Sequence, residues 1–248
     1  MGKVVVITGG GRGIGAATAR LAAERGFSVA VGFLRDTETA ESLVQEILKK
    51  GAKAIAVQGD VALEADVIRL FEETDRKLGR VTALVNNAGV VDRGARVEQI
   101  GPERLARMFA VNVTGSFLCA REAVKRMSRR RGGPGGAIVN VSSIAAKLGG
   151  AGEYVDYAAS KGAIDTFTIG LAKEVGPEGI RVNAVRPGII RTDIHLVSGD
   201  PARVERIGAT AALQRAGEAE EVARAILWLL SDEASYMTGA LVDVSGGR

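Results

Sequence analysis

The sequence predicts an α/β protein with a single doubly wound parallel sheet and helices on both of its faces. Short β-branched runs such as residues 4–7 alternate with helical patterns along the whole chain, which is the order of elements in parallel α/β folds. These runs hold few polar residues, as expected of strands buried on both faces of a sheet. Glycines or polar residues follow several runs, and ligands bind beyond the carboxyl ends of such strands. Because no Pro-rich or Ser-rich linker interrupts the pattern, we expect residues 1–248 to form one domain.

The composition is that of a folded α/β protein and not of a disordered or repetitive one. Of 248 residues, 46% are hydrophobic and 25% are charged, and no unit of about 20 to 50 residues recurs. No apolar run approaches the ~20 residues of a membrane span and no leader opens the chain, so we expect a cytoplasmic protein with no membrane partner. The single Cys119 excludes an internal disulfide. With only one histidine, His195, we also expect no metal site.

The formal net charge is +4, an excess that fits nucleic acid, an anionic ligand or no partner. Basic residues are scattered among acidic ones, which favours a phosphate-bearing ligand. The one basic run, residues 125–131, follows a helical pattern, where cations complement the helix dipole. We therefore expect no nucleic-acid partner, although this run keeps that alternative open.

The first strand, residues 4–7, leads into a glycine turn and a helical pattern to about Arg25. Glycines let the backbone turn sharply and approach a pyrophosphate, and the helix N-terminus supplies unpaired N–H groups. The turn reads Thr-Gly-x-x-x-Gly-x-Gly over residues 8–15 and includes Arg12. It indicates a dinucleotide site, with a glycine turn that binds nothing as the alternative.

The second strand, residues 28–33, bears on the choice between NADP and NAD. A carboxylate at its end would favour NAD by holding the ribose hydroxyls, but the strand ends in Phe33. Arg35 follows, and together with Arg12 it could hold the extra phosphate of NADP, because guanidinium groups match phosphate geometry. NAD stays an alternative because Asp36 is close. Both arginines could also point into solvent, and Asp36 is the expected N-cap of the next helix.

The third and fourth strands, residues 54–58 and 82–85, each end in polar residues. Asp60 follows the third strand and fits the N-cap of a helix over residues 63–78. Asn86 and its neighbouring amide follow the fourth, and amides at the end of a buried strand need hydrogen-bond partners.

Asn112 stands in the middle of a helical pattern over residues 102–127. Asn is a poor interior helix residue, so its place there costs stability unless its amide or a freed carbonyl has a role. An exposed or structural asparagine is the alternative.

The fifth strand, residues 137–143, ends in the hydroxyls of Ser142 and Ser143. Downstream, Tyr157 and Lys161 are four residues apart, so one helix face presents both. The cation favours the phenolate and would lower a phenol pKa that is ordinarily about 10. Such a pair suits general acid–base work on a carbonyl or alcohol.

The sixth strand, residues 180–185, runs into a proline-glycine turn. Over residues 190–213 the pattern then loses its period, which indicates a substrate lid. His195 lies in this lid, and we expect it to be a surface or substrate-contact residue and not a metal ligand. A helix and a last strand follow between residues 218 and 244.

In this order, the glycine turn, Asn-Asn-Ala-Gly at 86–89, Tyr-x-x-x-Lys at 157–161 and Pro-Gly-x-x-x-Thr at 187–192 resemble the short-chain dehydrogenase/reductase family over nearly the whole chain. The chain looks most like the ketoacyl-reductase and sugar-dehydrogenase-like members. The resemblance implies a Rossmann-type fold, a homotetramer, and the cofactor-binding residues Gly9, Arg12, Gly13, Ile14, Gly15, Arg35, Asp60, Val61, Asn87, Ala88, Gly89, Tyr157, Lys161, Pro187, Gly188, Ile190 and Thr192.

The resemblance also implies catalytic roles. Tyr157 would exchange a proton with the substrate, Lys161 would lower the tyrosine pKa and hold the nicotinamide ribose, and Asn112 would complete a proton relay through water. Ser143 would bind the substrate oxygen. It stands fourteen residues before Tyr157, one more than is usual in the family, which leaves Ser142 as a weaker rival.

We therefore expect an NADP(H)-dependent oxidoreductase that transfers a hydride between the nicotinamide and a small-molecule carbonyl or secondary alcohol. The competing class is a catalytically silent, cofactor-binding regulator on the same fold, and the complete Asn–Ser–Tyr–Lys set argues against it. The substrate stays open, since Lys147, Glu153, Tyr154 and His195 could serve a sugar, a ketoester or an acyl carrier.

Overall fold

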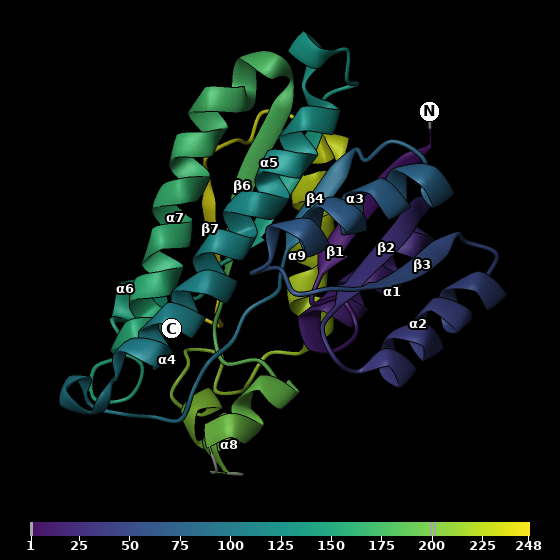
Figure 1. The fold of residues 1–248 in the computed structure, drawn as a ribbon. Helices are drawn as coiled ribbons and strands as arrows, with labels where there is room; N and C mark the ends of the chain where they lie inside the picture. Colours follow the sequence, from purple (N-terminus) through teal and green to yellow (C-terminus); the bar gives the residue numbers. More distant parts are fainter. Residues whose placement is uncertain (1, 199, 201) are drawn as a thin grey trace.

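The computed structural model describes residues 2–198, 200 and 202–248, in which seven parallel strands form a sheet of order β3-β2-β1-β4-β5-β6-β7 (Figure 1). The order reverses between β1 and β4, and a doubly wound sheet has its ligand crevice at such a point. The predicted fold class is confirmed. The strands are β1 Lys3–Thr8, β2 Phe27–Phe33, β3 Ala54–Gln58, β4 Ala83–Asn86, β5 Gly136–Val141, β6 Ile180–Pro187 and β7 Leu241–Val244.

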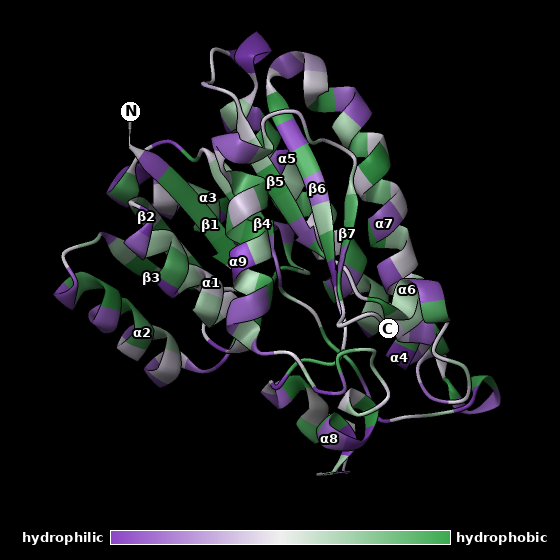
Figure 2. Cartoon of the chain, turned by 180° about the vertical axis from the view of Figure 1, so that it is seen from behind, coloured by the Kyte–Doolittle hydropathy of each residue, from purple (hydrophilic) through white to green (hydrophobic). Residues whose placement is uncertain are grey.

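Alternate side chains of β1, an interior strand of the sheet, face two apolar cores. Val5 and Ile7 of β1 belong to a core with α1 (Gly13–Glu24), α2 (Thr37–Lys49) and α9 (Ala219–Leu230). Val6 belongs to a core with α3 (Glu64–Leu78), α5 (Gly115–Met127) and α7 (Val155–Val175). All three side chains are fully buried, as a sheet covered on both faces requires. Figure 2 shows apolar strands enclosed by helices with hydrophilic outer residues.

The helix expected over residues 102–127 is interrupted by a wider turn. It runs as α4 (Pro102–Phe109), a π-helical turn η2 (Ala110–Thr114) and α5. Asn112 lies at the centre of η2 and is buried. Single π turns inside α-helices are frequent at functional sites, and this one explains how an interior asparagine is accommodated.

Two predicted caps have different outcomes. Asp36 caps α2 as expected, because its carboxylate accepts a hydrogen bond from Thr39 N at 3.0 Å. The predicted N-cap role of Asp60 is wrong, since α3 begins after Leu63 with no side-chain cap. Asp60 Oδ1 instead accepts from Ala62 N at 2.9 Å, within its own turn.

The region expected as an irregular lid contains short helices, η5 (Asp193–Ser198) and α8 (Arg203–Gly208). Figure 1 shows α8 beyond the carboxyl edge of the sheet. Residues 199 and 201 of this region, and the side chain of His195, lie outside the described residues. The short helix α6 (Ala145–Leu148) was not predicted. None of the described helices has the length and apolarity to cross a membrane.

Candidate active site

A cavity of about 750 Å³ opens at the carboxyl edge of the sheet. Its wall includes the glycine turn after β1, the ends of β2, β4, β5 and β6, and the first turn of α7. Of the predicted cofactor residues, the structure places all but Gly15 along this wall, together with Ser142 and Ser143. Residues distant in sequence therefore converge at one site, as a parallel sheet requires.

The glycine turn is held in a shape that only glycine allows. Asn87 Nδ2 donates to the carbonyl oxygens of Thr8 and Gly9, both at 2.9 Å. A Cβ on Gly15 would overlap Gly9 O and stand 2.7 Å from Asn87 Nδ2. Gly9 and Gly13 have φ values of +60° and +52°, in the left-handed region that favours glycine. The turn thus brings the N-terminus of α1 and its unpaired N–H groups to the cavity.

Arg12 and Arg35 line the cavity beside Asp36. Hydrogen bonds from the Thr39 hydroxyl and backbone hold the pKa of Asp36 below its ordinary value, with a smaller contribution from the charge of Arg12. Its carboxylate therefore stays ionised and engaged in capping α2. Arg35 forms no ion pair within the described part of the chain.

Tyr157 lies in the first turn of α7, and the Ser143 side chain is near enough to its hydroxyl to lower the pKa of the phenol. The Ser143 oxygen also accepts from Ala145 N at 3.1 Å, which leaves its own proton free to donate. Ser142 Oγ instead donates to the carbonyl of Lys161 at 3.2 Å. The structure therefore brings Ser143 and not Ser142 to the tyrosine hydroxyl.

The surrounding protein raises the pKa of Tyr157, and the Ser143 hydrogen bond opposes this only in part. The net shift is opposite to the lowering that the sequence predicts, because desolvation of the phenolate is its largest cause. A phenol that keeps its proton at neutral pH is still the form that a proton donor needs.

Lys161 is 4% exposed and donates from Nζ to Val141 O at 2.7 Å. Its Nζ lies 5.7 Å from the centroid of the Tyr157 ring. Burial lowers the pKa of Lys161 to about 8, although the charge of Asp165 partly opposes the shift. A cation with a pKa near neutrality can take part in proton transfer, unlike an exposed lysine.

Asn112 holds both backbone groups of Val90, with its Oδ1 2.7 Å from Val90 N and its Nδ2 3.0 Å from Val90 O. A Cβ on Gly89 would stand 3.4 Å from Asn112 Oδ1 and 3.5 Å from Lys161 Nζ. The two side chains thus approach each other over a glycine, across a space that a larger residue would fill.

Two predicted substrate contacts are already paired. Lys147 bonds Asp243 at 2.8 Å, and Glu153 pairs with Arg203 at 2.7 Å. The ring of Tyr154 lies 4.9 Å under the Arg203 guanidinium. Much of the remaining wall is apolar, and no sequence motif predicted these apolar residues. They include Val90, Val91, Ile144, Leu148, Ile189 and Ile194.

The basic run 125–131 lies away from the cavity wall and is partly neutralised. Arg126 pairs with Asp75, Lys125 with Glu122 at 2.8 Å, and Arg130 approaches a further carboxylate at 3.7 Å. These pairs favour the solvated helix end over a nucleic-acid patch.

A doubly wound sheet with a serine, a tyrosine and a lysine beside a glycine turn is the architecture of a nucleotide-dependent oxidoreductase. Residues 9–248 match a family model described as "Enoyl-(Acyl carrier protein) reductase". The chain belongs to the short-chain dehydrogenase/reductase family.

The relatives agree with this membership. The chain is 52% identical over 245 residues to "Uncharacterized oxidoreductase YgfF" of Escherichia coli, with 99% of each chain covered. It is 39% identical over 257 residues to "Versicolorin reductase 1" of Aspergillus parasiticus, covering 99% of this chain and 96% of the relative. A short-chain dehydrogenase from Burkholderia cenocepacia, solved in complex with NADP, superposes with a TM-score of 0.91 at 32% identity, over 100% of this chain and 98% of that one.

Proposed function

We propose that this protein is an NADP(H)-dependent oxidoreductase that interconverts a carbonyl compound and a secondary alcohol, with Tyr157 as acid or base. The observation that carries the proposal is the place of Ser143, Tyr157 and the buried Lys161 together in the cavity wall, where the Ser143 side chain acts on the tyrosine hydroxyl. A neutral hydroxyl pair of this kind can bind an oxygen and transfer a proton to it.

The residues present fit a dinucleotide phosphate. The glycine turn leaves a cradle that a Cβ on Gly15 would destroy, and the α1 N-terminus lies beside it. When bound, the cofactor would supply a hydride from its nicotinamide C4 as NADPH in reduction, and would accept one there as NADP⁺ in oxidation. The solved relative in complex with NADP supports this choice of cofactor.

In reduction, Ser143 donates a hydrogen bond to the substrate oxygen and Tyr157 donates its proton as negative charge develops there. The positive charge of Lys161 stabilises the phenolate that remains. Asn112, fixed by Val90 and close to Lys161, completes the relay that returns a proton to the tyrosine. Oxidation of the alcohol uses the same groups in reverse.

Preference for NADP over NAD is proposed from the end of β2. Arg12 and Arg35 line the cavity there, and two guanidinium groups can hold the ribose phosphate. Phe33 occupies the position where a carboxylate would repel that phosphate, and Asp36 is engaged by Thr39.

Assembly as a homotetramer is supported by apolar side chains exposed on α5 and α7. Phe117 is 48% exposed and stacks on Phe167 at 3.7 Å between ring centroids, and Ile169 is 38% exposed. A second copy of the chain would cover such a face. Light scattering that finds a monomer at micromolar concentration would contradict the tetramer. We also place the protein in the cytoplasm, as a single domain over residues 1–248 whose segment 190–213 covers the substrate.

The proposed function is tested by following NADPH and NADH absorbance with a panel of carbonyl compounds and, in reverse, secondary alcohols. Acetophenone, ethyl acetoacetate and fructose represent an aryl ketone, a ketoester and a sugar. We expect turnover with NADPH exceeding that with NADH. Binding of NADPH without turnover of any compound in either direction would favour a cofactor-binding regulator instead.

A further inference from the structure

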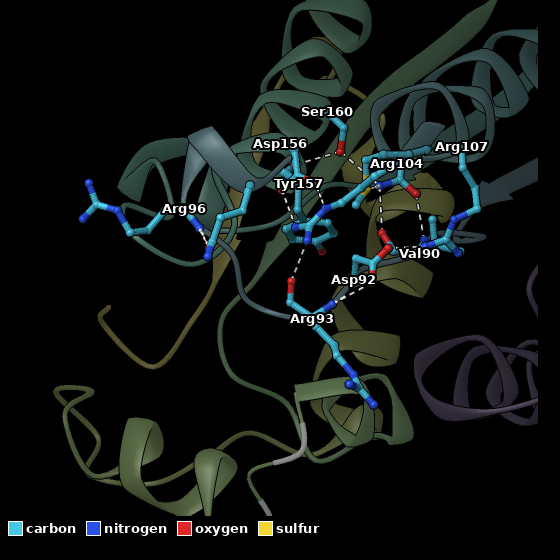
Figure 3. A network of polar contacts seen from close by, with 12 residues as sticks. Val90, Asp92, Arg93, Arg96, Arg104, Arg107, Asp156, Tyr157 and Ser160 are labelled. Atoms are coloured by element: carbon cyan, nitrogen blue, oxygen red, sulfur yellow. Dashed lines mark hydrogen bonds and ion pairs between the residues drawn. The ribbon is translucent and has the colours of Figure 1, made fainter. Parts of the chain in front are cut away.

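The helix that leads to Asn112 also carries an arginine that contacts two segments next to the site. Arg104 of α4 donates from Nε to Asp156 Oδ2 at 2.7 Å and from Nη2 to Asp156 Oδ1 at 3.1 Å. Its Nη1 donates to Arg93 O at 2.7 Å. Figure 3 shows Arg104 between these two partners. One guanidinium therefore joins the start of α7 to the chain that follows β4.

The segment of residues 90–95 that follows β4 contains no helix or strand, and side chains hold it in addition to one backbone hydrogen bond, from Ala95 N to Glu153 O at 2.9 Å. Asn112 holds Val90 at both backbone groups, Arg107 pairs with Asp92, and Arg104 holds the Arg93 carbonyl. Val90 belongs to the cavity wall. Successive turns of α4 and η2 thus position this part of the wall.

The other partner, Asp156, precedes Tyr157 in the first turn of α7. Side chains of neighbouring helix residues point about 100° apart around the helix axis. Because Asp156 is held against α4, the first turn of α7 cannot rotate about its axis, and this fixes the direction in which the Tyr157 side chain points. Ser160 adds a second link. Its Oγ donates to the backbone carbonyl oxygen of Tyr157 at 2.7 Å and accepts from Asn112 Nδ2 at 3.0 Å. Both links run between the Asn112 helix and the tyrosine turn.

The Arg104–Asp156 pair contributes more to the orientation of the two helices' side chains than to the stability of the fold. The side chains are 15% and 1% exposed, and replacing a buried ion pair by apolar residues is often neutral or stabilising. A planar guanidinium bound to both carboxylate oxygens does fix orientation. A misplacement of about 1 Å at a catalytic group can cost about a hundredfold in rate.

We propose that Arg104 is a positioning residue that aligns Tyr157 with the wall segment 90–95, acting through Asp156 and the Arg93 carbonyl. The inference rests on the proposed function, because it takes Tyr157 as the proton donor. Arg104 is not among the residues that line the cavity, so its loss should alter kcat and leave NADPH affinity unchanged.

The test compares Arg104→Met, Arg104→Lys and the double variant Arg104→Met/Asp156→Leu with the wild type, using the best ketone of the panel. Thermal unfolding reports the fold, and NADPH fluorescence titration reports cofactor affinity. Arg104→Met strands a buried carboxylate and should lose stability. The double variant removes both charges and should regain it. A positioning role predicts that kcat of the stable double variant stays at least tenfold low with NADPH affinity within twofold of wild type.

Arg104→Lys keeps the positive charge but not the planar guanidinium that binds both carboxylate oxygens. Its kcat should therefore lie between that of Arg104→Met and that of the wild type. The matched control is Arg96→Met in the neighbouring segment, whose ion pair with Glu98 is solvent-exposed; its kcat should stay within twofold of wild type. A stable double variant with wild-type kcat would overturn the inference and leave only a structural role. Tyr157→Phe in the same assay separates the two claims, because full activity there would refute the proposed function itself.

Discussion

Replacing Arg35 by alanine should weaken NADPH binding and leave NADH binding nearly unchanged. Arg35 lines the cavity and forms no ion pair within the described residues, so its charge is available to a phosphate. A charge-assisted hydrogen bond contributes about 1.5–3 kcal/mol, which corresponds to roughly ten- to a hundredfold in Kd. Because Arg35 is exposed, the effect should lie toward the lower end and shrink as salt screens the charge.

The assay is fluorescence titration of both reduced cofactors at about 0.1 M salt, where screening acts beyond about 10 Å. Asp36→Asn is the matched control, because asparagine caps a helix about as well as aspartate but lacks its charge. This variant should bind NADPH at least as tightly as wild type. Equal weakening of both cofactors by Arg35→Ala, or a wild type that prefers NADH, would refute the phosphate assignment and turn attention to Asp36.

Three further predictions address the site and its turn. Ser143→Ala should lower kcat by about 10²–10³, as for loss of one oxyanion donor, whereas Ser142→Ala should change kcat little; steady-state kinetics of both separates the two serines. Gly15→Ala should unfold at a lower denaturant concentration than Gly11→Ala. The methyl group added at residue 15 would overlap backbone, whereas the one added at residue 11 would stand 3.6 Å from its nearest neighbour. Equal unfolding midpoints for the two variants would contradict the turn geometry. Lys161→Met should be more stable than wild type at pH 7, by up to about 3 kcal/mol. A lysine pKa lowered to about 8 from 10.5 destabilises the folded state below pH 8, and this penalty should fade between pH 8 and 10.5 in denaturant titrations; a difference that does not depend on pH would contradict it.

The sheet and most helix positions could be predicted because their signals are local. Buried β-branched runs mark strands such as β1, and Asp36 with Thr39 marks a helix start through chemistry within four residues. The π turn at Asn112 could be suspected only from an awkward residue in a helix, because its shape depends on packing. The N-cap prediction for Asp60 failed because its carboxylate accepts a hydrogen bond from the nearby Ala62 N instead of from the first turn of the helix.

The candidate site was predictable to the extent that its residues sit in motifs. The sequence left Ser142 and Ser143 both open, and only the three-dimensional path after β5 shows which one meets Tyr157. The direction of the tyrosine pKa shift was mispredicted because spacing reveals the nearby cation but not the burial, which is the largest cause of the shift. The Arg104–Asp156 pair joins residues 52 positions apart, beyond any local pattern.

The central claim, that Tyr157 transfers the proton, is tested most directly by Tyr157→Phe, which keeps the ring and removes only the hydroxyl. With kcat and NADPH affinity measured on the same preparation, we expect kcat to fall by about 10²-fold or more, the usual scale of general acid–base catalysis. NADPH affinity should stay within a few-fold of wild type, because the ring still lines the cavity. A variant that turns over at nearly the wild-type rate would contradict the account.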